Sequence, residues 1–273
     1  NTKHVIYVWL DALTNYLSAL NYPKVEDQLY KMYWPASLHV IGKDILRFHA
    51  IYWPAFLLAA KIQPPQRIFS HGWILSGDEK MSKSKHNVVN PDDVIEQYGA
   101  DTLRLYEMFL GPLEQAKPWN TAGITGVHNF LKKLWKLYHN NEEFAVTDAE
   151  PSKDSLKTLH KTIKKVTEDI ENFSFNTSVS TFMICVNELT SQKCTSKAIL
   201  EPLAVLISPY APHIAEELWS KLGNEGSVAF AAYPKFEEKH LKESSKTYPV
   251  SFNGKMRFTI DLSLDLSKDE LEE

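Results

Sequence analysis

Apolar residues in the first third of the chain fall into short runs, and segments with a helical pattern separate these runs. Residues 3–10 are almost continuously apolar, β-branched and aromatic, which is typical of a strand buried on both faces of a sheet. Two further runs of this kind lie at 38–42 and 67–75, and the segments between the runs, 12–20 and 44–60, have helical patterns. The order strand, helix, strand, helix, strand predicts an α/β layer with a parallel sheet.

Two residues define the expected course of the helix at 44–60. Asp44 follows the second apolar run, and a carboxylate in that position can cap a helix by accepting N–H groups of its first turn. Pro54 lies inside the segment and has no N–H to donate, so we expect it to bend the helix.

After residue 76 the apolar runs give way to a polar, basic loop and then to helices. Pro91 opens a helix whose first turn carries two aspartates. Apolar residues recur at helical spacing further on, which predicts helices at 156–170, 179–189, 199–207 and 212–222. Helices of this kind form a bundle. Residues 248–262 then alternate like two strands joined at Asn253-Gly254, a dipeptide typical of a hairpin turn.

Composition limits the classes to which the chain can belong. Its 273 residues are 44% hydrophobic and 23% charged, values of an ordinary globular protein that exclude disordered and collagen-like classes. No apolar run approaches the roughly 18–20 residues of a membrane-spanning helix, so we expect no membrane partner. The two cysteines exclude a disulfide scaffold and a cysteine-based zinc site, and they fit a reducing compartment. We expect Cys185 to lie in the core and Cys194 to be exposed.

The net charge of −4 conceals an uneven distribution. Residues 261–273 contain six acids and one lysine, which together carry −5, so the rest of the chain sums to about +1. Local basic clusters can therefore bind nucleic acid although the whole chain is acidic. The chain begins Asn1-Thr2-Lys3, without a methionine or a signal-peptide pattern, and we expect it to be a piece of a longer protein.

The segment with the strongest chemical signal is Lys80-Met81-Ser82-Lys83-Ser84, which Lys85 and His86 follow. It places three lysines on a loop near the end of a predicted parallel strand, and ligands of open α/β sheets bind at the carboxyl ends of strands. Mobile ammonium groups there can neutralise charge that develops on phosphates during phosphoryl or adenylyl transfer. A solvated basic loop is the simpler alternative.

With this string, the chain resembles the class I aminoacyl-tRNA synthetases over nearly its whole length, and the resemblance divides at the string. Residues 3–83 resemble methionyl-tRNA synthetase, in Tyr7-Val8-Trp9-Leu10-Asp11-Ala12, His39-Val40-Ile41-Gly42-Lys43-Asp44-Ile45 and His71-Gly72-Trp73-Ile74. From about residue 80 onward the chain resembles bacterial leucyl-tRNA synthetase, in Asn87-Val88-Val89-Asn90-Pro91, Tyr98-Gly99-Ala100-Asp101-Thr102-Leu103-Arg104 and Ala211-Pro212-His213-Ile214-Ala215-Glu216-Glu217-Leu218-Trp219. A chimera with its join at the lysine string would give this division.

The resemblance implies α/β structure followed by all-α structure. The expected parts are the C-terminal half of a Rossmann-type parallel sheet at 1–76, the lysine loop with a connecting helical segment at 77–122, a helical anticodon-binding-type bundle at 123–235 and the start of a truncated small domain at 236–273. It also implies tRNA and ATP as partners, Mg²⁺ that arrives with ATP, no metal held by the protein, and a cytoplasmic location. The oligomeric state is left open.

For ATP, the resemblance implies a site made of Gly42, Asp44, His71, Gly72, Ile74 and Lys83, with catalytic roles for Lys80 and Lys83. Asp44 would accept the ribose hydroxyl protons, although a helix cap explains the same residue. Gly72 would let the backbone approach the nucleotide, because glycine has no Cβ. The two lysines would neutralise the pyrophosphate.

For the amino acid, the resemblance implies a pocket lined by Trp9, Ala12, Leu13, Tyr16, Ile45, His49 and Tyr52. Aromatic walls suit a polarizable thioether, since sulfur–aromatic contacts contribute about 0.3–1.5 kcal/mol, and His49 can add a polar contact near sulfur. Leu13 and Ile45 can equally be core residues. We therefore expect methionine as the amino acid, with leucine as the alternative because most residues by count are leucyl-like.

The predicted bundle carries a basic cluster of Lys132, Lys133 and Lys136, which could face tRNA phosphates or could be a solvated helix face. The sequence contains no His-x-Gly-His string, the other ATP-binding signature of the family, so we expect an incomplete adenylation site in the isolated chain. Besides a ligase, two alternatives therefore remain. One is a non-catalytic tRNA-binding module, and the other is a helical interaction domain.

Overall fold

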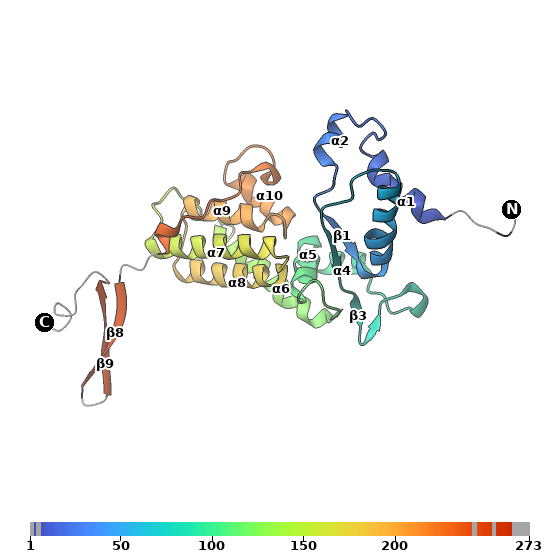
Figure 1. The fold of residues 1–273 in the computed structure, drawn as a ribbon. Helices are drawn as coiled ribbons and strands as arrows, with labels where there is room; N and C mark the ends of the chain where they lie inside the picture. Colours follow the sequence, from blue (N-terminus) through green and yellow to red (C-terminus); the bar gives the residue numbers. More distant parts are fainter. Residues whose placement is uncertain (1–2, 4–6, 242–244, 253–254, 264–273) are drawn as a thin grey trace.

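The computed structural model describes residue 3 and residues 7–241, 245–252 and 255–263. It has a part with small sheets, a helical bundle beside this part and a hairpin beyond the bundle (Figure 1). The helices of the sheet part are α1 (Val8–Ser18), α2 (Gln28–Tyr33), α3 (Trp53–Ala59), α4 (Pro91–Tyr98) and α5 (Ala100–Phe109). Its strands are β1 (His39–Gly42), β2 (Ile68–His71), β3 (Ile74–Ser76), β4 (Glu79–Lys80) and β5 (Lys117–Pro118).

Strands β1 and β2 pair in parallel, with His39 opposite Ile68 and Gly42 opposite His71. This pairing confirms the parallel sheet predicted from the second and third apolar runs. A second sheet has the order β4-β3-β5, in which β3 is parallel to β5 and antiparallel to β4. The chain therefore turns back directly after β3, forms β4 and carries the lysine loop from there.

The strand predicted at 3–10 is wrong from Val8 onward, because α1 begins at that residue, and residues 4–6 lie outside the described part of the chain. Leu13 and Leu17 are buried in α1, and their spacing of four places them on the same helix face. A continuous apolar run does not by itself distinguish a strand from a buried helix. Here the helix predicted at 12–20, in which Leu13 and Leu17 are spaced by four, extends back into the run as far as Val8.

The segment at 44–60 is three short elements in place of one bent helix. A 3₁₀ turn (Lys43–Ile45) is followed by a π-helical turn (Phe48–Tyr52) and then by α3. Asp44 lies inside the 3₁₀ turn, whose cap makes no side-chain hydrogen bond, so the predicted helix cap is wrong. Pro54 lies in the first turn of α3, where its missing N–H has no intrahelical partner to lose.

The bundle confirms the predicted amphipathic helices. It consists of α6 (Ile124–Tyr138), α7 (Lys153–Glu171), α8 (Phe175–Ser191), α9 (Lys197–Ile207) and α10 (Pro212–Lys221). A short hairpin follows α6, with strands β6 (His139–Asn140) and β7 (Glu143–Phe144). Further 3₁₀ turns lie at Lys83–Lys85, Thr121–Gly123, Val228–Phe230 and Glu238–His240. Every helix in the described part of the chain is too short or too polar to span a lipid bilayer.

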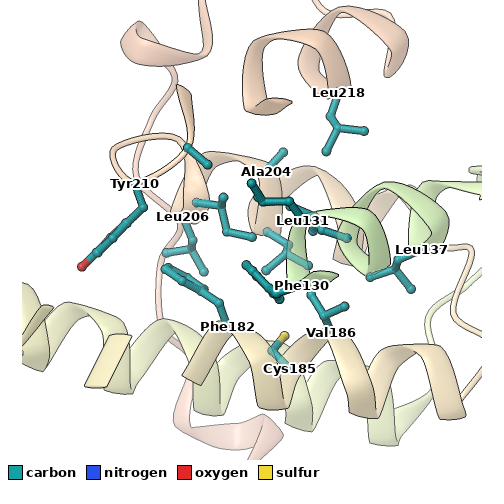
Figure 2. Close-up of a cluster of buried hydrophobic side chains, with 14 of the residues drawn as sticks. Phe130, Leu131, Leu137, Phe182, Cys185, Val186, Ala204, Leu206, Tyr210 and Leu218 are labelled. Carbon is teal, nitrogen blue, oxygen red and sulfur yellow. The ribbon is translucent and has the colours of Figure 1, made fainter. Parts of the chain in front are cut away.

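The core of the bundle forms where α6, α8 and α9 meet. Phe182 and Val186 of α8 pack there with Phe130 of α6, and all three are buried (Figure 2). Cys185 points into the same cluster, and burial raises the pKa of its thiol to about 12. Cys194 is also buried, which contradicts the expected exposure, because the chain folds back after α8 and carries this residue into the core.

Strands β8 (Ser245–Phe252) and β9 (Lys255–Ser263) pair antiparallel, with a register shift between Val250 and Ser251. This pairing confirms the two alternating strands predicted at 248–262. The predicted turn residues, Asn253-Gly254, lie outside the described part of the chain.

A buried aspartate joins the sheet part to the bundle. Asp101, in the first turn of α5, accepts the backbone N–H of Ile214 at 2.7 Å and that of His213 at 3.2 Å. The His213 ring nitrogen Nδ1 lies 2.7 Å from the same carboxylate. Asp101 therefore supplies the cap that α10 lacks within its own sequence, and it fixes α10 against α5.

Replacing Asp101 with alanine is expected to lower the free energy of unfolding by about 2–3 kcal/mol, because buried N–H groups at the start of α10 lose a charged acceptor. Urea denaturation followed by circular dichroism measures this loss. Asp92→Ala, at an exposed position in the first turn of α4, is the control and should cost less than about 0.5 kcal/mol. Equal losses in the two variants would contradict the capping role.

Candidate functional site

The carboxyl ends of β1 and β2 form an edge at which three of the expected ATP residues gather. Gly42 and His71 end the two strands opposite each other. A Cβ atom on Gly42 would lie 2.7 Å from Oδ1 of Asp44 and 3.7 Å from the His71 ring. A side chain at position 42 would therefore make the Asp44 carboxylate move from its present place over this edge.

The ammonium group of Lys80 reaches the same edge from the lysine loop. Lys80 Nζ lies 3.7 Å from Oδ2 of Asp44 and 4.9 Å from the centre of the Trp73 ring, and Lys43 Nζ lies 5.9 Å from that ring. Lys80 and Asp44 are about half exposed, so their pairing adds little stability. The pairing instead places the Lys80 ammonium group beside the carboxylate at this edge. Trp73 was not singled out in the sequence, although a tryptophan close to a lysine-rich loop is a signal for cation–π contacts.

Asn87 holds the lysine loop in shape. Its Oδ1 accepts the N–H of Ser82 at 2.8 Å, and its Nδ2 donates to the Lys80 carbonyl at 3.3 Å. Two hydrogen bonds from one side chain thus close the loop around the Lys83–Lys85 turn. The sequence gives only a weak signal for this role, a lone asparagine after the basic string.

The three lysines of the loop differ in what holds them. Lys80 lies beside Asp44, and Lys85 donates to Glu79 at 3.0 Å. The exposed Lys83 ammonium makes no ion pair or hydrogen bond with the residues that the structure describes. Of the two expected catalytic lysines, the fold therefore brings Lys80 to the edge and leaves Lys83 on the exposed loop.

Gly72 serves the packing of the chain itself. Its N–H donates to the Leu113 carbonyl at 2.7 Å, and a Cβ atom at this position would lie 2.2 Å from the Gln115 carbonyl oxygen. The space left by the missing side chain is thus filled by the backbone of Gln115. We expected this space to be open to the nucleotide, and it is not. Sequence alone could not reveal this contact, because it joins segments far apart along the chain.

Ile74 is the first residue of β3, and its backbone N–H and C=O groups lie on the side of the strand away from β5. The carbonyls of Trp73 and Leu75 accept the N–H groups of Lys117 and Trp119, each at 2.8 Å. Backbone groups alternate sides along a strand, so those of Ile74 point away from β5. If Ile74 belongs to the expected ATP site, a main-chain contact with ATP would have to use that other side.

His49 is the centre of the expected amino-acid pocket. Its Nδ1 lies 3.0 Å from the Ile45 carbonyl, and its Nε2 lies 3.0 Å from the Tyr16 hydroxyl. A carbonyl can only accept, so Nδ1 carries a proton, and in the neutral ring Nε2 accepts the Tyr16 hydroxyl. The Trp9 ring meets His49 edge-on at 6.2 Å. His49 lies in the π-helical turn, an irregularity that is frequent at functional sites.

Two of the other expected pocket residues, Leu13 and Tyr52, adjoin this cluster through side chains that pack with Trp9. Leu13 is 1% exposed and packs in the core with Leu17 and Trp53. This burial supports the alternative that Leu13 is a core residue. Ala12 is exposed on α1, and Tyr52 packs against Tyr7 and Phe48.

His39 is a further member of the cluster that the sequence did not single out. Its ring lies 4.4 Å from that of Tyr16 and 6.2 Å from that of His49. Burial, together with the nearby His49, lowers the pKa of His39, so its ring is neutral at pH 7. The sequence did contain a signal for this role of His39, namely a histidine inside an otherwise apolar strand.

A groove of about 540 Å³ lies between the first turns of α5 and α10 and one face of α6. Its apolar lining includes Leu131 and Ile214, and its basic residues include Lys132, Lys136 and His213. Lys133 lies outside this lining and donates to the Asn187 side chain at 3.2 Å, because consecutive helix residues point about 100° apart. The fold therefore brings two of the three expected tRNA lysines to one groove.

The chain is similar to known synthetases in both parts. A family model described as tRNA synthetases class I (M) matches residues 1–140, and one described as the anticodon-binding domain of tRNA ligase matches residues 152–272. The leucine–tRNA ligase of Christiangramia forsetii is 80% identical over 194 residues, which are 71% of this chain and 20% of that protein. The leucine–tRNA ligase of Parabacteroides distasonis is 53% identical over 261 residues, which are 95% of this chain and 27% of that protein.

The chain thus spans about a fifth to just over a quarter of the length of these relatives. Because the second alignment covers 95% of the chain, a single leucyl relative spans the lysine string at which the two resemblances meet, and a chimera is not needed to explain them.

Solved structures show the same two likenesses. The LeuRS of Agrobacterium radiobacter K84, in a ternary complex with tRNA and LeuAMS, has a TM-score of 0.74 and 25% identity, covering 97% of this chain and 37% of that chain. The Mycobacterium tuberculosis methionyl-tRNA synthetase in complex with methionyl-adenylate has a TM-score of 0.67 and 30% identity, covering 81% of this chain and 51% of that chain.

Within the described ranges, no three His, Cys, Asp or Glu side chains converge as a metal site would require.

Gly72→Ala is expected to destabilise the fold by about 2–3 kcal/mol or more, because the new methyl group would overlap the Gln115 backbone. Gly126→Ala is the matched control, since a Cβ there meets nothing within 4 Å and alanine favours a helix by about 0.5–1 kcal/mol. Chemical denaturation of both variants measures the difference. A Gly72→Ala protein as stable as the parent would contradict the packing role.

Proposed function

Because the chain belongs to the class I tRNA synthetases, we propose that it is part of a leucine–tRNA ligase. The observation that carries this proposal is the meeting of Lys80 with Asp44 at the edge where Gly42 and His71 end their strands. An ammonium group suits the phosphates of a nucleotide, a carboxylate suits its ribose hydroxyls, and the carboxyl ends of parallel strands are where such ligands bind. The same proposal places the protein in the cytoplasm.

The reaction would proceed in two steps. The carboxylate of the amino acid attacks the α-phosphate of ATP, and the bond between the α- and β-phosphates breaks to release pyrophosphate. Lys80 and Lys83 would neutralise charge on the leaving pyrophosphate, while Asp44 would hold the ribose. A terminal ribose hydroxyl of tRNA then takes the acyl group and AMP leaves. Mg²⁺ would arrive with ATP and help to neutralise its charge, and the part of catalysis left to the chain's own residues would be positioning and charge stabilisation.

Leucine replaces methionine as the proposed amino acid, which corrects the expectation from the sequence. The leucyl relatives are 80% and 53% identical, whereas the methionyl structure is 30% identical over 81% of the chain. The cluster of Trp9, Tyr16 and His49 therefore occurs in a leucyl-like chain and does not identify methionine. The side chains of leucine and methionine have the same number of heavy atoms, and even a whole methylene changes binding by only about 1–3 kcal/mol, so apolar walls alone separate the two amino acids weakly.

Exposed apolar side chains support the view that the chain is one part of a larger ligase. Val8 on α1 is 67% exposed, Val40 on β1 is 56% exposed and Ile51 in the π-helical turn is 59% exposed. Large apolar groups left in water on these elements suit surfaces that other parts of a ligase would cover. The relatives are four to five times as long as the segments they share with this chain, which agrees with this view.

A second candidate, a tRNA-binding module without catalysis, is favoured by the basic groove of the bundle. Lys132 and Lys136 could contact phosphates there in either case. Both candidates therefore predict tRNA binding, and only the ligase predicts amino-acid-dependent exchange of pyrophosphate into ATP.

In the complete ligase, leucine is expected to support ATP–pyrophosphate exchange and methionine is not. Lys80→Ala and Lys83→Ala should each lower kcat for this exchange by roughly tenfold to a thousandfold, because each removes a cation from the leaving group. Isotope exchange with either amino acid at saturating ATP measures both effects.

Lys85→Ala is the control for these variants, because Glu79 holds the Lys85 ammonium group. The rate of pyrophosphate exchange by this variant should stay within about fivefold of the parent rate. Exchange with methionine but not leucine would overturn the leucine assignment. Exchange with neither amino acid, alongside intact tRNA binding, would favour the module.

Replacing Lys132 and Lys136 together with alanine should weaken tRNA binding by the chain and flatten the dependence of log Kd on log salt by about two, since two phosphate contacts are lost. Filter binding over a series of KCl concentrations measures the slope. The double variant Lys153→Ala with Lys193→Ala removes the same charge from positions outside the groove and is the control. Equal slopes for both double variants would show that the groove does not contact tRNA.

A further inference from the structure

The turn between α7 and α8 reaches across to strand β2 of the nucleotide edge. The Phe173 ring is stacked on the Phe69 ring, with centres 4.4 Å apart and planes 13° apart. The guanidinium group of Arg67 lies 4.7 Å from the centre of the same Phe173 ring. Phe69 lies in β2, two residues before His71, so an aromatic side chain of the bundle touches the strand that ends at the proposed ATP site.

The backbone of Phe173 is held in a conformation that bulky residues rarely adopt. Its φ is 58°, in the left-handed region that glycine occupies without steric cost. An aromatic residue persists there only where its surroundings determine the conformation, and such positions cluster at functional sites. Glycine could not supply the ring that stacks on Phe69 and also meets Arg67 and Phe175.

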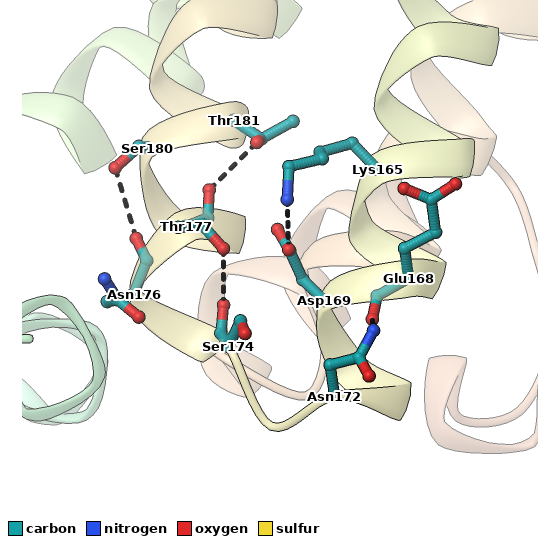
Figure 3. Close-up of polar contacts among 9 residues, drawn as sticks. All are labelled: Lys165, Glu168, Asp169, Asn172, Ser174, Asn176, Thr177, Ser180 and Thr181. Atoms are coloured by element: carbon teal, nitrogen blue, oxygen red, sulfur yellow. Dashed lines mark hydrogen bonds and ion pairs between the residues drawn. The ribbon is translucent and has the colours of Figure 1, made fainter. Parts of the chain in front are cut away.

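Hydrogen bonds on both sides brace the turn (Figure 3). Asn172 Nδ2 donates to the Glu168 carbonyl at 2.8 Å, and the N–H of Ser174 donates to the Asp169 carbonyl at 2.7 Å. On the α8 side, the Thr177 hydroxyl donates to the Ser174 carbonyl at 2.7 Å. Phe173 is therefore presented to β2 from a fixed support.

Two polar ties between the sheet part and the bundle end on α5. Asp101 binds the start of α10, and Arg104 donates to the Pro209 carbonyl at 3.0 Å. Beside Arg104, a cavity of about 320 Å³ separates α5 from Ile170 and Phe175. These ties orient α5, whereas the Phe173 contact reaches the strand itself.

We propose that Phe173 is a positioning residue for the nucleotide edge, which it sets from the bundle by stacking on Phe69 and so fixing strand β2. The proposal rests on the proposed function in so far as ATP is the ligand of that edge. If the strand is set in this way, loss of the ring weakens ATP binding uniformly, which raises the KM for ATP and leaves kcat nearly unchanged.

Phe173→Gly tests this proposal in the complete ligase, because it removes the ring and relieves the backbone strain at once. We expect the KM for ATP in leucine-dependent pyrophosphate exchange to rise by about twofold to tenfold, the range that the loss of one aromatic pair gives. At saturating ATP, kcat should stay within about twofold. Phe173→Tyr keeps the stacked ring and should restore the parent KM, whereas Phe230→Ala, which removes a 91% exposed ring elsewhere on the bundle, should not change it.

Hydrogen exchange on the chain itself provides the second measurement. Amides of β2 should exchange faster in Phe173→Gly than in Phe230→Ala, while thermal unfolding shows that both variants remain folded. Unchanged β2 exchange together with an unchanged KM would overturn the proposal, as would a fall in kcat without a rise in KM. If the parent ligase showed no exchange of pyrophosphate at all, the proposed function would fail, and faster β2 exchange would still support the positioning contact.

Discussion

The parallel pairing of β1 with β2 is the constraint on which the candidate site depends. It sets Gly42 opposite His71, and Asp44 and Trp73 follow these two residues by two positions each, so the chain delivers both to the same edge. The antiparallel return of β4 then brings Lys80 back to that edge. A one-residue slip of β2 against β1 would separate the carboxylate, the indole and the ammonium group, because successive strand residues face opposite sides.

The return path from the sheet to the bundle depends on buried charge. Lys117 of β5 is 7% exposed, and its ammonium donates to the Gly111 carbonyl at 3.1 Å. Burial lowers the pKa of Lys117 and raises that of Glu107, while the attraction between these two groups opposes both shifts. Burying such groups is costly unless they are paired, so the segment that leaves α5 and enters the second sheet is held in one arrangement. That segment also supplies the Gln115 backbone against Gly72.

Repeated local patterns predicted most of the fold, and single residues predicted much less of the site. Helix α7 was predictable because an apolar residue recurs on the buried face at each helical turn, namely Leu159, Ile163 and Val166. Asp44 was expected to cap a helix and instead faces Lys80, because the helix breaks into 3₁₀ and π turns. The contact of Phe173 with β2 had no local signal at all, since it joins elements about a hundred residues apart.

The hydrogen bonds of His49 remove one of the two physical arguments that favoured methionine, the polar contact near sulfur. In the neutral ring Nδ1–H is committed to the Ile45 carbonyl, and Nε2 accepts the Tyr16 hydroxyl, so no N–H of His49 remains for a substrate sulfur. Tyr16 keeps only acceptor lone pairs, and a thioether sulfur, itself a weak acceptor, gains nothing from them. What remains is an aromatic wall formed by Trp9 and its neighbours, which in the proposed ligase would attract a branched aliphatic side chain through burial and a thioether through sulfur–aromatic contacts. In the proposed leucine–tRNA ligase, selectivity between the two amino acids would then come from the shape of the pocket, because an isobutyl group is stiffer than a thioether and loses less rotamer freedom in a fixed shape.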